Sequence, residues 1–249
     1  MLADHLSADE IASLSALSPS LISVFDSLPS TNTHLATLAR EGAPAFRVIL
    51  AESQSAGRGR LGRSFFSPPG SGIYLSILLR PKHLDAGRLT TLAAVVVSDA
   101  IFETCGIKVD IKWVNDLVFN GKKLCGILAE GVGTAYAVLG IGINVSTTAF
   151  PPQLSDTATS LQEICGTAPN RNRLVAEILK RFVHADLDGF SHMKKYRRRC
   201  VTLGKTVRVV STGETVRVVK IQDNGALLVA DQNGEKRHIA SGEVSLIPV

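Results

Sequence analysis

The alternation of apolar and polar stretches along residues 1–200 predicts a chain of intermixed strands and helices. Short, mainly apolar stretches bounded by Gly, Pro, Ser or Asn are typical of buried strands. We expect such strands at 21–28, 47–52, 71–79, 109–113, 123–130 and 136–145. Apolar residues recurring at helical spacing predict helices at 7–17, 33–41, 88–105 and 171–196, the last as one unbroken helix. This mixture predicts an α+β fold.

The pattern changes near Val201, where short apolar stretches alternate with glycine turns. Strands are predicted at 206–210, 215–221, 226–230, 236–239 and 244–247. The turns between them are predicted at 212–213, 224–225, 233–234 and 241–242. Even spacing of short strands is typical of a small antiparallel barrel. We therefore expect residues 1–200 to form a domain of catalytic size and residues 201–249 to form a small β-barrel domain.

Composition narrows the class of protein. With 45% apolar and 20% charged residues, the chain of 249 residues has the make-up of a globular protein. No apolar run reaches the roughly 18 residues of a membrane helix, and residues 1–5 hold no Lys or Arg of a signal peptide. The four cysteines are widely spaced, which argues against a zinc site or a disulfide framework. We therefore expect a cytoplasmic protein that does not bind membranes.

The net charge of the chain says little about its ligand or partner. The net charge of +5 is compatible with anionic substrates or an acidic protein partner, but it is too small to require a nucleic acid. The chemistry instead concentrates in GRGRLGR at residues 57–63, which follows the apolar strand at 47–52. Glycine lets a backbone approach a ligand closely, and the arginine fork matches carboxylate and phosphate. This loop suits an anionic small molecule, although Arg/Gly tracts also bind nucleic acids.

Three further polar clusters lie at strand ends or in tight connections, where binding groups are common. Ser30-Thr31-Asn32 precedes a predicted helix, so it suits both a helix cap and a ligand contact. KWVND at 112–116 is also compatible with a strand end followed by an Asx turn. The hairpin signal at 120–121 returns Lys123 towards Lys112, and apolar residues follow Lys123 directly. GIGIN at 140–144 completes the set.

These blocks, in this order, resemble the biotin protein ligases from about residue 25 to the C-terminus. Residues 52–63 are similar to the biotinyl-adenylate loop of that family, residues 112–116 with 123–130 to its second signature, and residues 140–144 to its third. Val114 stands where the family usually has proline, and Phe65-Phe66 where it often has tryptophan. The resemblance implies a mixed-sheet catalytic domain related to the class II aminoacyl-tRNA synthetase and biotin ligase folds, with a small C-terminal SH3-like β barrel.

The resemblance also implies a two-step reaction. Biotin and ATP, with Mg²⁺, form biotinyl-5′-AMP and pyrophosphate, and a lysine of an acceptor protein then attacks the mixed anhydride. The biotin contacts implied by the resemblance are Ser30, Thr31, Asn32, Gln54, Gly57, Arg58, Gly59, Arg60, Lys123 and Gly126. The implied ATP or adenylate contacts are Arg58, Arg60, Arg63, Phe65, Asn115, Lys123 and Asn144, with Phe65 expected to stack on the adenine.

The expected catalytic groups are cationic, because repulsion between a carboxylate and a triphosphate opposes the first step. Lys123 is the main electrophilic group, expected to contact the biotin carboxyl and the α-phosphate, with Arg60 beside it. Lys112 and Asp116 are second choices. Asp116 is expected either to deprotonate the incoming lysine or to hold Mg²⁺, and the metal ligands stay open. The glycine loop is expected to be mobile when empty.

The implied partner is the biotin carrier domain of a biotin-dependent carboxylase. Only 29 residues precede Ser30, too few for the DNA-binding winged helix that some family members carry, so we expect a ligase that does not bind DNA. The basic run 194–199 is interpreted as a solvated helix end. A monomer or a weak homodimer is expected, with residues 136–145 as the strand that would extend the sheet between copies.

Two alternatives remain. A lipoate protein ligase would share the fold and the adenylation step, but its phosphate loop holds less arginine than residues 57–63. A non-enzymatic RNA-binding module could use the arginine loop and the barrel. Residues 201–249 contain no Phe, Tyr or Trp, so they lack the aromatic platform on which bases stack.

Overall fold

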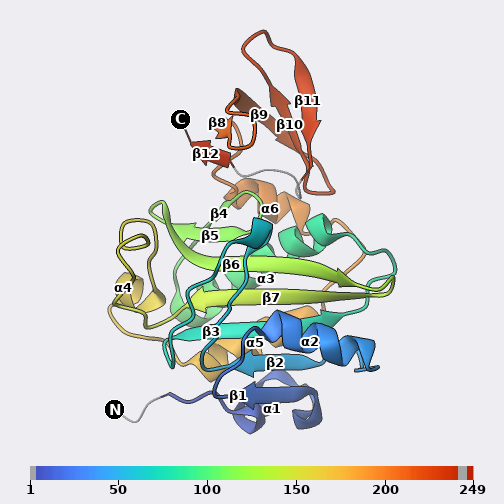
Figure 1. The fold of residues 1–249 in the computed structure, drawn as a ribbon, viewed down its shortest axis with the longest axis vertical. Helices are drawn as coiled ribbons and strands as arrows, with labels where there is room; N and C mark the ends of the chain where they lie inside the picture. The colour runs from blue at the N-terminus through green and yellow to red at the C-terminus, as the bar shows by residue number, and fades with distance from the viewer. Residues whose placement is uncertain (1–3, 241–245, 249) are drawn as a thin grey trace.

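A computed structural model describes residues 4–240 and 246–248, and its main element is a seven-stranded mixed sheet. The strand order is β1-β2-β3-β7-β6-β5-β4 (Figure 1). The strands are β1 (Ile22–Phe25), β2 (Val48–Ala51), β3 (Gly72–Leu79), β4 (Asp110–Lys112), β5 (Asp116–Phe119), β6 (Lys122–Val132) and β7 (Tyr136–Asn144). β1 and β2 are parallel, and every other neighbouring pair is antiparallel.

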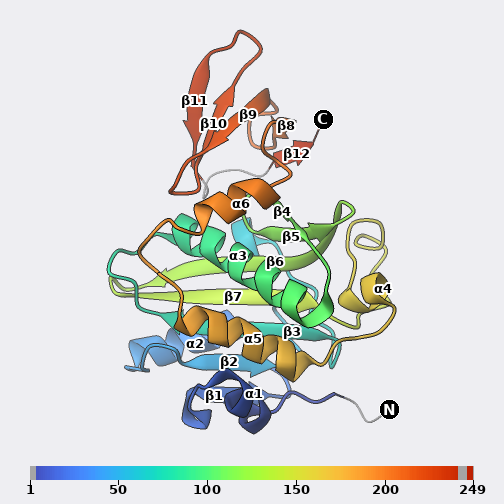
Figure 2. The ribbon, with the colours of Figure 1, turned by 180° about the vertical axis from the view of Figure 1, so that it is seen from behind.

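Helices cover the two faces of this sheet unequally. The helices are α1 (Ala8–Ser15), α2 (Thr31–Arg40), α3 (Ala86–Cys105), α4 (Leu161–Cys165), α5 (Arg171–Val183) and α6 (Met193–Arg199), with short 3-10 turns η1 (Pro19–Leu21) and η2 (Arg60–Gly62). α3 and α5 lie across one face, where the main core packs (Figure 2). On the other face, α2 lies over β2, β3 and one end of β7 (Figure 1). The rest of that face is therefore left for the connecting loops.

Side-chain alternation along β3 explains how one strand serves both faces. Ile73, Leu75 and Ile77 point into the main core under α3 and α5. Ser76 and Leu78 point the other way, and Leu78 packs with Leu35 and Ile49 beneath α2. Both sides of the strand are buried, which is why β3 reads as a continuous apolar stretch.

The long helix predicted at 171–196 is wrong, because α5 ends at Val183 and α6 begins at Met193. Asp186 Oδ1 accepts the backbone N–H groups of Asp188 and Gly189, at 3.1 and 2.8 Å. A side chain that binds nearby backbone donors in this way competes with the helix for them. Asp188 then accepts N–H groups at residues 82 and 83, which ties the break to the start of α3.

The basic run in α6 is also less solvated than predicted. Lys195 and Arg199 both pair with Asp99 on α3, at 2.9 and 2.6 Å. Arg197 pairs with Asp223 in the C-terminal sheet. Three of the cations are therefore paired with neighbouring elements, although the Lys195 side chain stays 52% exposed.

The C-terminal sheet has the order β11-β10-β9-β8-β12 and is antiparallel throughout. Its strands are β8 (Thr206–Val209), β9 (Thr215–Ile221), β10 (Leu227–Ala230), β11 (Lys236–Ile239) and β12 (Leu246–Pro248). Within the described residues β11 and β12 do not pair, so the predicted closed barrel is an open sheet; the β10–β11 hairpin extends away from β12 (Figure 1). The predicted turn at 241–242 and the start of the predicted strand at 244 lie outside the described residues.

The strand predicted to join two copies is wrong for that role. β7 lies inside the sheet, where it is hydrogen-bonded to β3 on one side and to β6 on the other. The edge strands of this sheet are β1 and β4, and Ile111 of β4 already accepts the N–H of Val201 at 3.0 Å. In residues 4–240 and 246–248 no helix is both long and apolar enough to cross a membrane.

Candidate functional site

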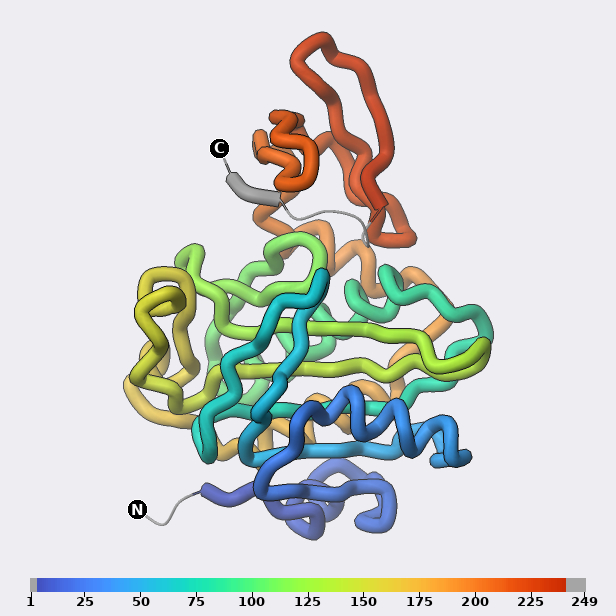
Figure 3. The backbone as a smooth tube through the Cα atoms, in the orientation of Figure 1, coloured from blue at the N-terminus to red at the C-terminus, as the bar shows by residue number. Residues whose placement is uncertain are grey.

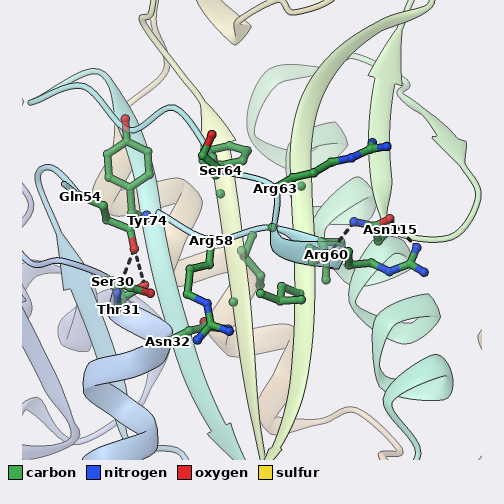
Figure 4. Close-up of a pocket in the computed structure, with 18 of the residues that line it drawn as sticks. Ser30, Thr31, Asn32, Gln54, Arg58, Arg60, Arg63, Ser64, Tyr74 and Asn115 are labelled. Atoms are coloured by element: carbon green, nitrogen blue, oxygen red, sulfur yellow. Dashed lines mark hydrogen bonds between the residues drawn. The ribbon is translucent and has the colours of Figure 1, made fainter. Parts of the chain in front are cut away.

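A cavity of about 290 Å³ opens on the face of the large sheet that α2 leaves uncovered. The arginine loop crosses this face in front of β6 and β7 (Figure 3). The cavity brings together most of the residues singled out from the sequence, namely Ser30, Thr31, Asn32, Gln54, Arg58, Gly59, Arg60, Arg63, Phe65, Asn115, Asp116, Lys123 and Gly126. Figure 4 shows the arrangement of the residues from α2, the loop and β3. Segments far apart in the chain therefore meet in one site.

One end of the cavity holds neutral hydrogen-bonding groups. Ser30 caps α2, its Oγ accepting the N–H of Thr33 at 3.4 Å. Gln54 Oε1 accepts the backbone N–H of Thr31 at 2.9 Å and its hydroxyl at 3.2 Å (Figure 4). Gln54 Nε2 donates to Ser67 Oγ at 3.0 Å. This end therefore presents buried donors and acceptors without a net charge.

Glu130 extends this network and was missed from the sequence. Asn32 Nδ2 donates to Glu130 Oε2 at 2.8 Å, and Arg58 Nη2 lies 3.1 Å from Glu130 Oε1. Ser76 Oγ, fully buried on β3, donates to Asn32 Oδ1 at 2.6 Å. Side chains alternate between the two faces of a strand, so Glu130 and Gly126, both on β6, face the same side. This alternation is the sequence signal from which Glu130 could have been found. Glu130 thus links the arginine loop to the start of α2.

Glycines form the floor of the cavity. Gly142 on β7 pairs with Gly126 on β6, and Gly140 lies on the same face two residues earlier. A Cβ atom on Gly142 would lie 2.6 Å from Cε1 of Phe65, and one on Gly140 would lie 2.2 Å from Oδ1 of Asn32. The floor is therefore bare because neighbouring side chains already occupy the space above it.

The ring of Phe65 stands between two other side chains of the cavity. The Tyr74 ring meets it edge-on, with the centroids 6.4 Å apart. The Lys123 Nζ lies 6.0 Å from the centroid of the Phe65 ring. Gly57, which lies in the wall of neither cavity described here, comes close to the backbone of the same segment, because its Cβ would lie 2.5 Å from the carbonyl oxygen of Phe65. This position needs glycine for packing of the loop.

The arginine loop is pinned at both its middle and its ends. Gly59 N–H donates to the Arg63 carbonyl at 2.6 Å, which closes the loop around η2. Arg60 Nη1 donates to Asn115 Oδ1 at 3.2 Å (Figure 4). Burial lowers the pKa of the Arg60 guanidinium from its ordinary value, and the charge of Asp116 opposes that shift. Arg60 and Asp116 line the same cavity.

Lys123 and Asp116 form an ion pair, with Nζ 2.8 Å from Oδ1. The backbone of Lys123 is fixed from outside its own strand, since its N–H donates to the Thr157 carbonyl at 2.7 Å and its carbonyl accepts from Thr159 at 2.9 Å. A second cavity of about 260 Å³ adjoins the first. The residues that line both cavities are Ser64, Phe65, Asp116, Lys123 and Leu154. The ion pair therefore stands where the two cavities meet.

The remaining predicted residues lie in the second cavity. Lys112 lines it together with Lys123, towards which the hairpin signal was expected to return it, and Lys112 is paired in register with Asp116. Asn144 also lines it, and its Nδ2 donates to the Thr159 carbonyl at 3.0 Å in a buried position. Phe66 and Phe150 supply apolar wall. This cavity combines aromatic surface with cations, a combination suited to an anionic ligand that carries a flat ring.

A preformed metal site is not part of this arrangement. In the described portion of the chain, no group of three or more His, Cys, Asp or Glu side chains is placed to hold a metal ion. Asp116 is the carboxylate that lines both cavities. Mg²⁺ commonly binds through one or two carboxylates together with the phosphates of a substrate, and Asp116 fits that pattern.

Comparison with known proteins returned one consistent group. Residues 24–145 match the Biotin/lipoate A/B protein ligase family, and residues 202–247 match the Biotin protein ligase C terminal domain. The chain is 36% identical over 236 residues to the Bifunctional ligase/repressor BirA of Bacillus subtilis, covering 89% of this chain and 72% of that protein. It is 33% identical over 229 residues to the Biotin--[acetyl-CoA-carboxylase] ligase of Mycobacterium tuberculosis, covering 86% and 85%.

Solved structures give the same result for the fold. The biotin protein ligase from Aquifex aeolicus in complex with biotin and ATP superposes with a TM-score of 0.77 at 31% sequence identity. The match covers 92% of this chain and 99% of the Aquifex chain. It therefore extends over both the large sheet and the C-terminal sheet.

Proposed function

The chain belongs to the biotin protein ligase family, and from that premise we propose that the first cavity holds biotin while the second holds the nucleotide. The protein is an ATP-dependent ligase that activates biotin as biotinyl-5′-AMP and transfers it to a carrier protein. The observation that carries the division of the site is the position of Lys123, which lines both cavities. A cation there meets both the carboxylate of one substrate and the α-phosphate of the other.

The neutral end of the first cavity suits the ureido head of biotin. An uncharged group with donors and an acceptor requires matching partners in an otherwise enclosed pocket. Ser30, Thr31 and Gln54 supply hydroxyl and amide groups there, held in place by the hydrogen bonds among them and to Ser67. Because the Phe65 and Asn32 side chains lie directly over Gly142 and Gly140, the ring and chain of biotin would lie against these side chains. The carboxylate of biotin would extend towards Lys123.

Adenylation follows from that placement. An oxygen of the biotin carboxylate forms a bond to the α-phosphorus, and the bond from that phosphorus to the pyrophosphate oxygen breaks. Lys123 and Arg60 stabilise the negative charge that gathers between the substrates. Mg²⁺ bound with ATP supplies further charge neutralisation, and Asp116 is the side chain that would hold it. Arg58 and Arg63 contribute positive charge from the loop, and Phe65 bounds both substrates.

Transfer uses the same junction. The amine of the acceptor lysine attacks the acyl carbon of biotinyl-5′-AMP, and AMP leaves. Asp116 is within reach of this point and takes the proton from the amine, while Asn115 and Asn144 position the ribose or phosphate. Replacement of Asp116 by Asn is expected to slow single-turnover transfer from preformed adenylate by about 100-fold. An unchanged transfer rate would remove Asp116 from this role.

The acceptor we propose is the biotin carrier domain of a biotin-dependent carboxylase. The support for it is the similarity to ligases named for acetyl-CoA carboxylase in Mycobacterium tuberculosis and Paracoccus denitrificans. The lipoate alternative is not favoured, because the second matching family is named for biotin protein ligases and the matched Aquifex aeolicus structure at 31% identity is in complex with biotin and ATP.

The test is biotin-dependent release of pyrophosphate from MgATP, with lipoate as the competing substrate. We expect release with biotin, and a fall in rate of about 10²- to 10³-fold when Lys123 becomes Met. The matched control is Lys122→Met, because Lys122 is the exposed neighbour on the same strand. Release that persists in Lys123→Met would move the electrophilic role to another residue. Release with lipoate but none with biotin would contradict the proposed substrate.

A further inference from the structure

Trp113, the single tryptophan of the chain, joins the C-terminal sheet to the large one. Its side chain is 6% exposed, and its Nε1 donates to the carbonyl of Gly225 at 2.8 Å. Gly225 lies in the turn between β9 and β10, in a left-handed conformation with φ of 83°. The backbone N–H of Trp113 donates to Thr202 Oγ1 at 3.0 Å. Trp113 is therefore fixed from two directions by residues beyond position 200.

α6 supports the same segment from the side. Tyr196 is fully buried, and its hydroxyl donates to the carbonyl of Val114 at 3.0 Å. The next residue, Arg197, donates from Nε to the Ile221 carbonyl at 2.9 Å and pairs with Asp223. α6 thus contacts residue 114 with one side chain and the β9–β10 hairpin with the next. These contacts form a bracket around residues 113 and 114.

The two residues that follow the bracket belong to the site. Asn115 Oδ1 accepts from Arg60, and the Asn115 backbone carbonyl accepts the N–H of Ile127 at 3.0 Å. Asp116 pairs with Lys123 at the junction of the cavities. The ureido end of the first cavity is built separately, from α2 and the segment after β2. Asn115 lines the first cavity and Asp116 lines both, so the bracket adjoins the junction of the two cavities and lies away from the end proposed for the biotin head.

We propose that the C-terminal sheet positions the adenylation machinery, with Trp113 and Tyr196 as positioning residues that hold Asn115 and Asp116 in register with Arg60 and Lys123. This inference rests on the proposed function. The inference predicts that variants of the bracket affect MgATP use and biotin binding differently. Loosening the bracket weakens the use of MgATP and the rate of adenylate formation, while biotin binding by the free protein is preserved.

The test compares Trp113→Phe and Tyr196→Phe, each of which keeps an aromatic ring and removes one hydrogen bond. Arg197→Met loosens the hairpin without touching residues 113–116. Calorimetric titration with biotin gives the dissociation constant and the fraction of competent sites. Biotin-dependent exchange of pyrophosphate with ATP then gives kcat and KM for MgATP per competent site. Each variant is expected to lower kcat/KM for MgATP by about fivefold, with biotin affinity unchanged.

Asn172→Ala is the matched control for a loss of stability alone. Asn172 is buried on α5, where it accepts from the Ser7 N–H and donates to the His5 carbonyl, away from both cavities. We expect it to lower the melting temperature and to leave KM for MgATP unchanged. The double variant Trp113→Phe/Tyr196→Phe is expected to lose less than the product of the single effects, since both act on one segment.

Two results would overturn the inference. Bracket variants that behave like Asn172→Ala, with a lower melting temperature and unchanged kinetics per competent site, would give the bracket a purely structural role. Variants that weaken biotin and MgATP equally would remove the division between the two ends. A wild-type protein that fails to exchange pyrophosphate in the presence of biotin would overturn the proposed function, and with it this inference.

Discussion

Replacement of Gly142 by Ala tests whether the Phe65 ring, which stands over Gly142, bounds the space that biotin fills. The new Cβ would stand 2.6 Å from Cε1 of Phe65, whereas ordinary contact begins at 3.4 Å, so the ring has to move by at least 3.4 − 2.6 = 0.8 Å. The backbone of Gly142 cannot recede, because the strand is paired on both sides, with Tyr74 and with Gly126. The ring therefore moves into the cavity.

The size of the effect of Gly142→Ala on stability and on biotin affinity depends on whether the displaced ring meets free space or bound biotin. In the empty protein the displaced ring enters free space, so the melting temperature changes little. With biotin bound that space is filled, and overpacking costs about 1–3 kcal/mol, which corresponds to a dissociation constant weaker by about 5- to 150-fold. Calorimetric titration with biotin, together with thermal unfolding with and without biotin, measures both quantities.

Gly131→Ala is the matched control in the same sheet. A Cβ there would also be too close to a neighbour, at 2.8 Å from Cδ2 of Leu84. That neighbour is the end of a flexible side chain that is 40% exposed, so it yields into solvent. We expect Gly131→Ala to bind biotin like the wild type. Equal biotin affinity in Gly142→Ala and the wild type would refute the assignment of the space beside Phe65 to biotin.

Two further predictions concern charged groups. Glu130→Gln removes the ionic partner of Arg58, so trypsin is expected to cleave the empty loop at 58–63 about two- to fivefold faster. Cleavage that biotin and MgATP fail to slow would contradict the role of this loop in binding the substrates. Burial lowers the pKa of His192 to about 4, below its ordinary 6.5. The unfolded chain therefore gains its proton first as the pH falls through 6.5, which destabilises the fold by about 2 kcal/mol at pH 5 relative to neutral pH. Thermal unfolding at pH 7 and pH 5 should show a smaller loss in His192→Gln than in the wild type, and equal losses would count against this assignment.

Apolar patterning predicted the large sheet well because most of its strands are buried on one or both faces. The strand expected at 71–79 is β3 at Gly72–Leu79, and the helix expected at 33–41 is α2 at Thr31–Arg40. The helix expected at 171–196 was wrong because its periodicity persists through the break. The interruption comes from Asp186, whose carboxylate takes up two backbone N–H groups, and a polar residue in a connecting segment leaves no trace in an apolar pattern.

The site was predictable where its residues cluster in sequence. Ser30 to Asn32, the arginine loop and residues 112–116 stand out as polar groups beside apolar strands, and the structure gathers them in adjoining cavities. Glu130 and Ser76 were missed because each lies alone within a strand. Only the register of the sheet and the packing of α2 bring them against Asn32, and neither is visible in the local pattern.

The shared wall of the two cavities also has a consequence for how tightly the intermediate is held. On the proposed division of the site, the two halves of biotinyl-5′-AMP would lie in neighbouring compartments, so once one half is bound the other faces a high effective concentration at its own compartment. The free energies of the two half-sites then add without a second loss of translational freedom, and the joined molecule binds far more tightly than biotin alone. On that assignment Lys123 and Asp116 stand where the two ligands are joined, and we expect slow release of the reactive anhydride.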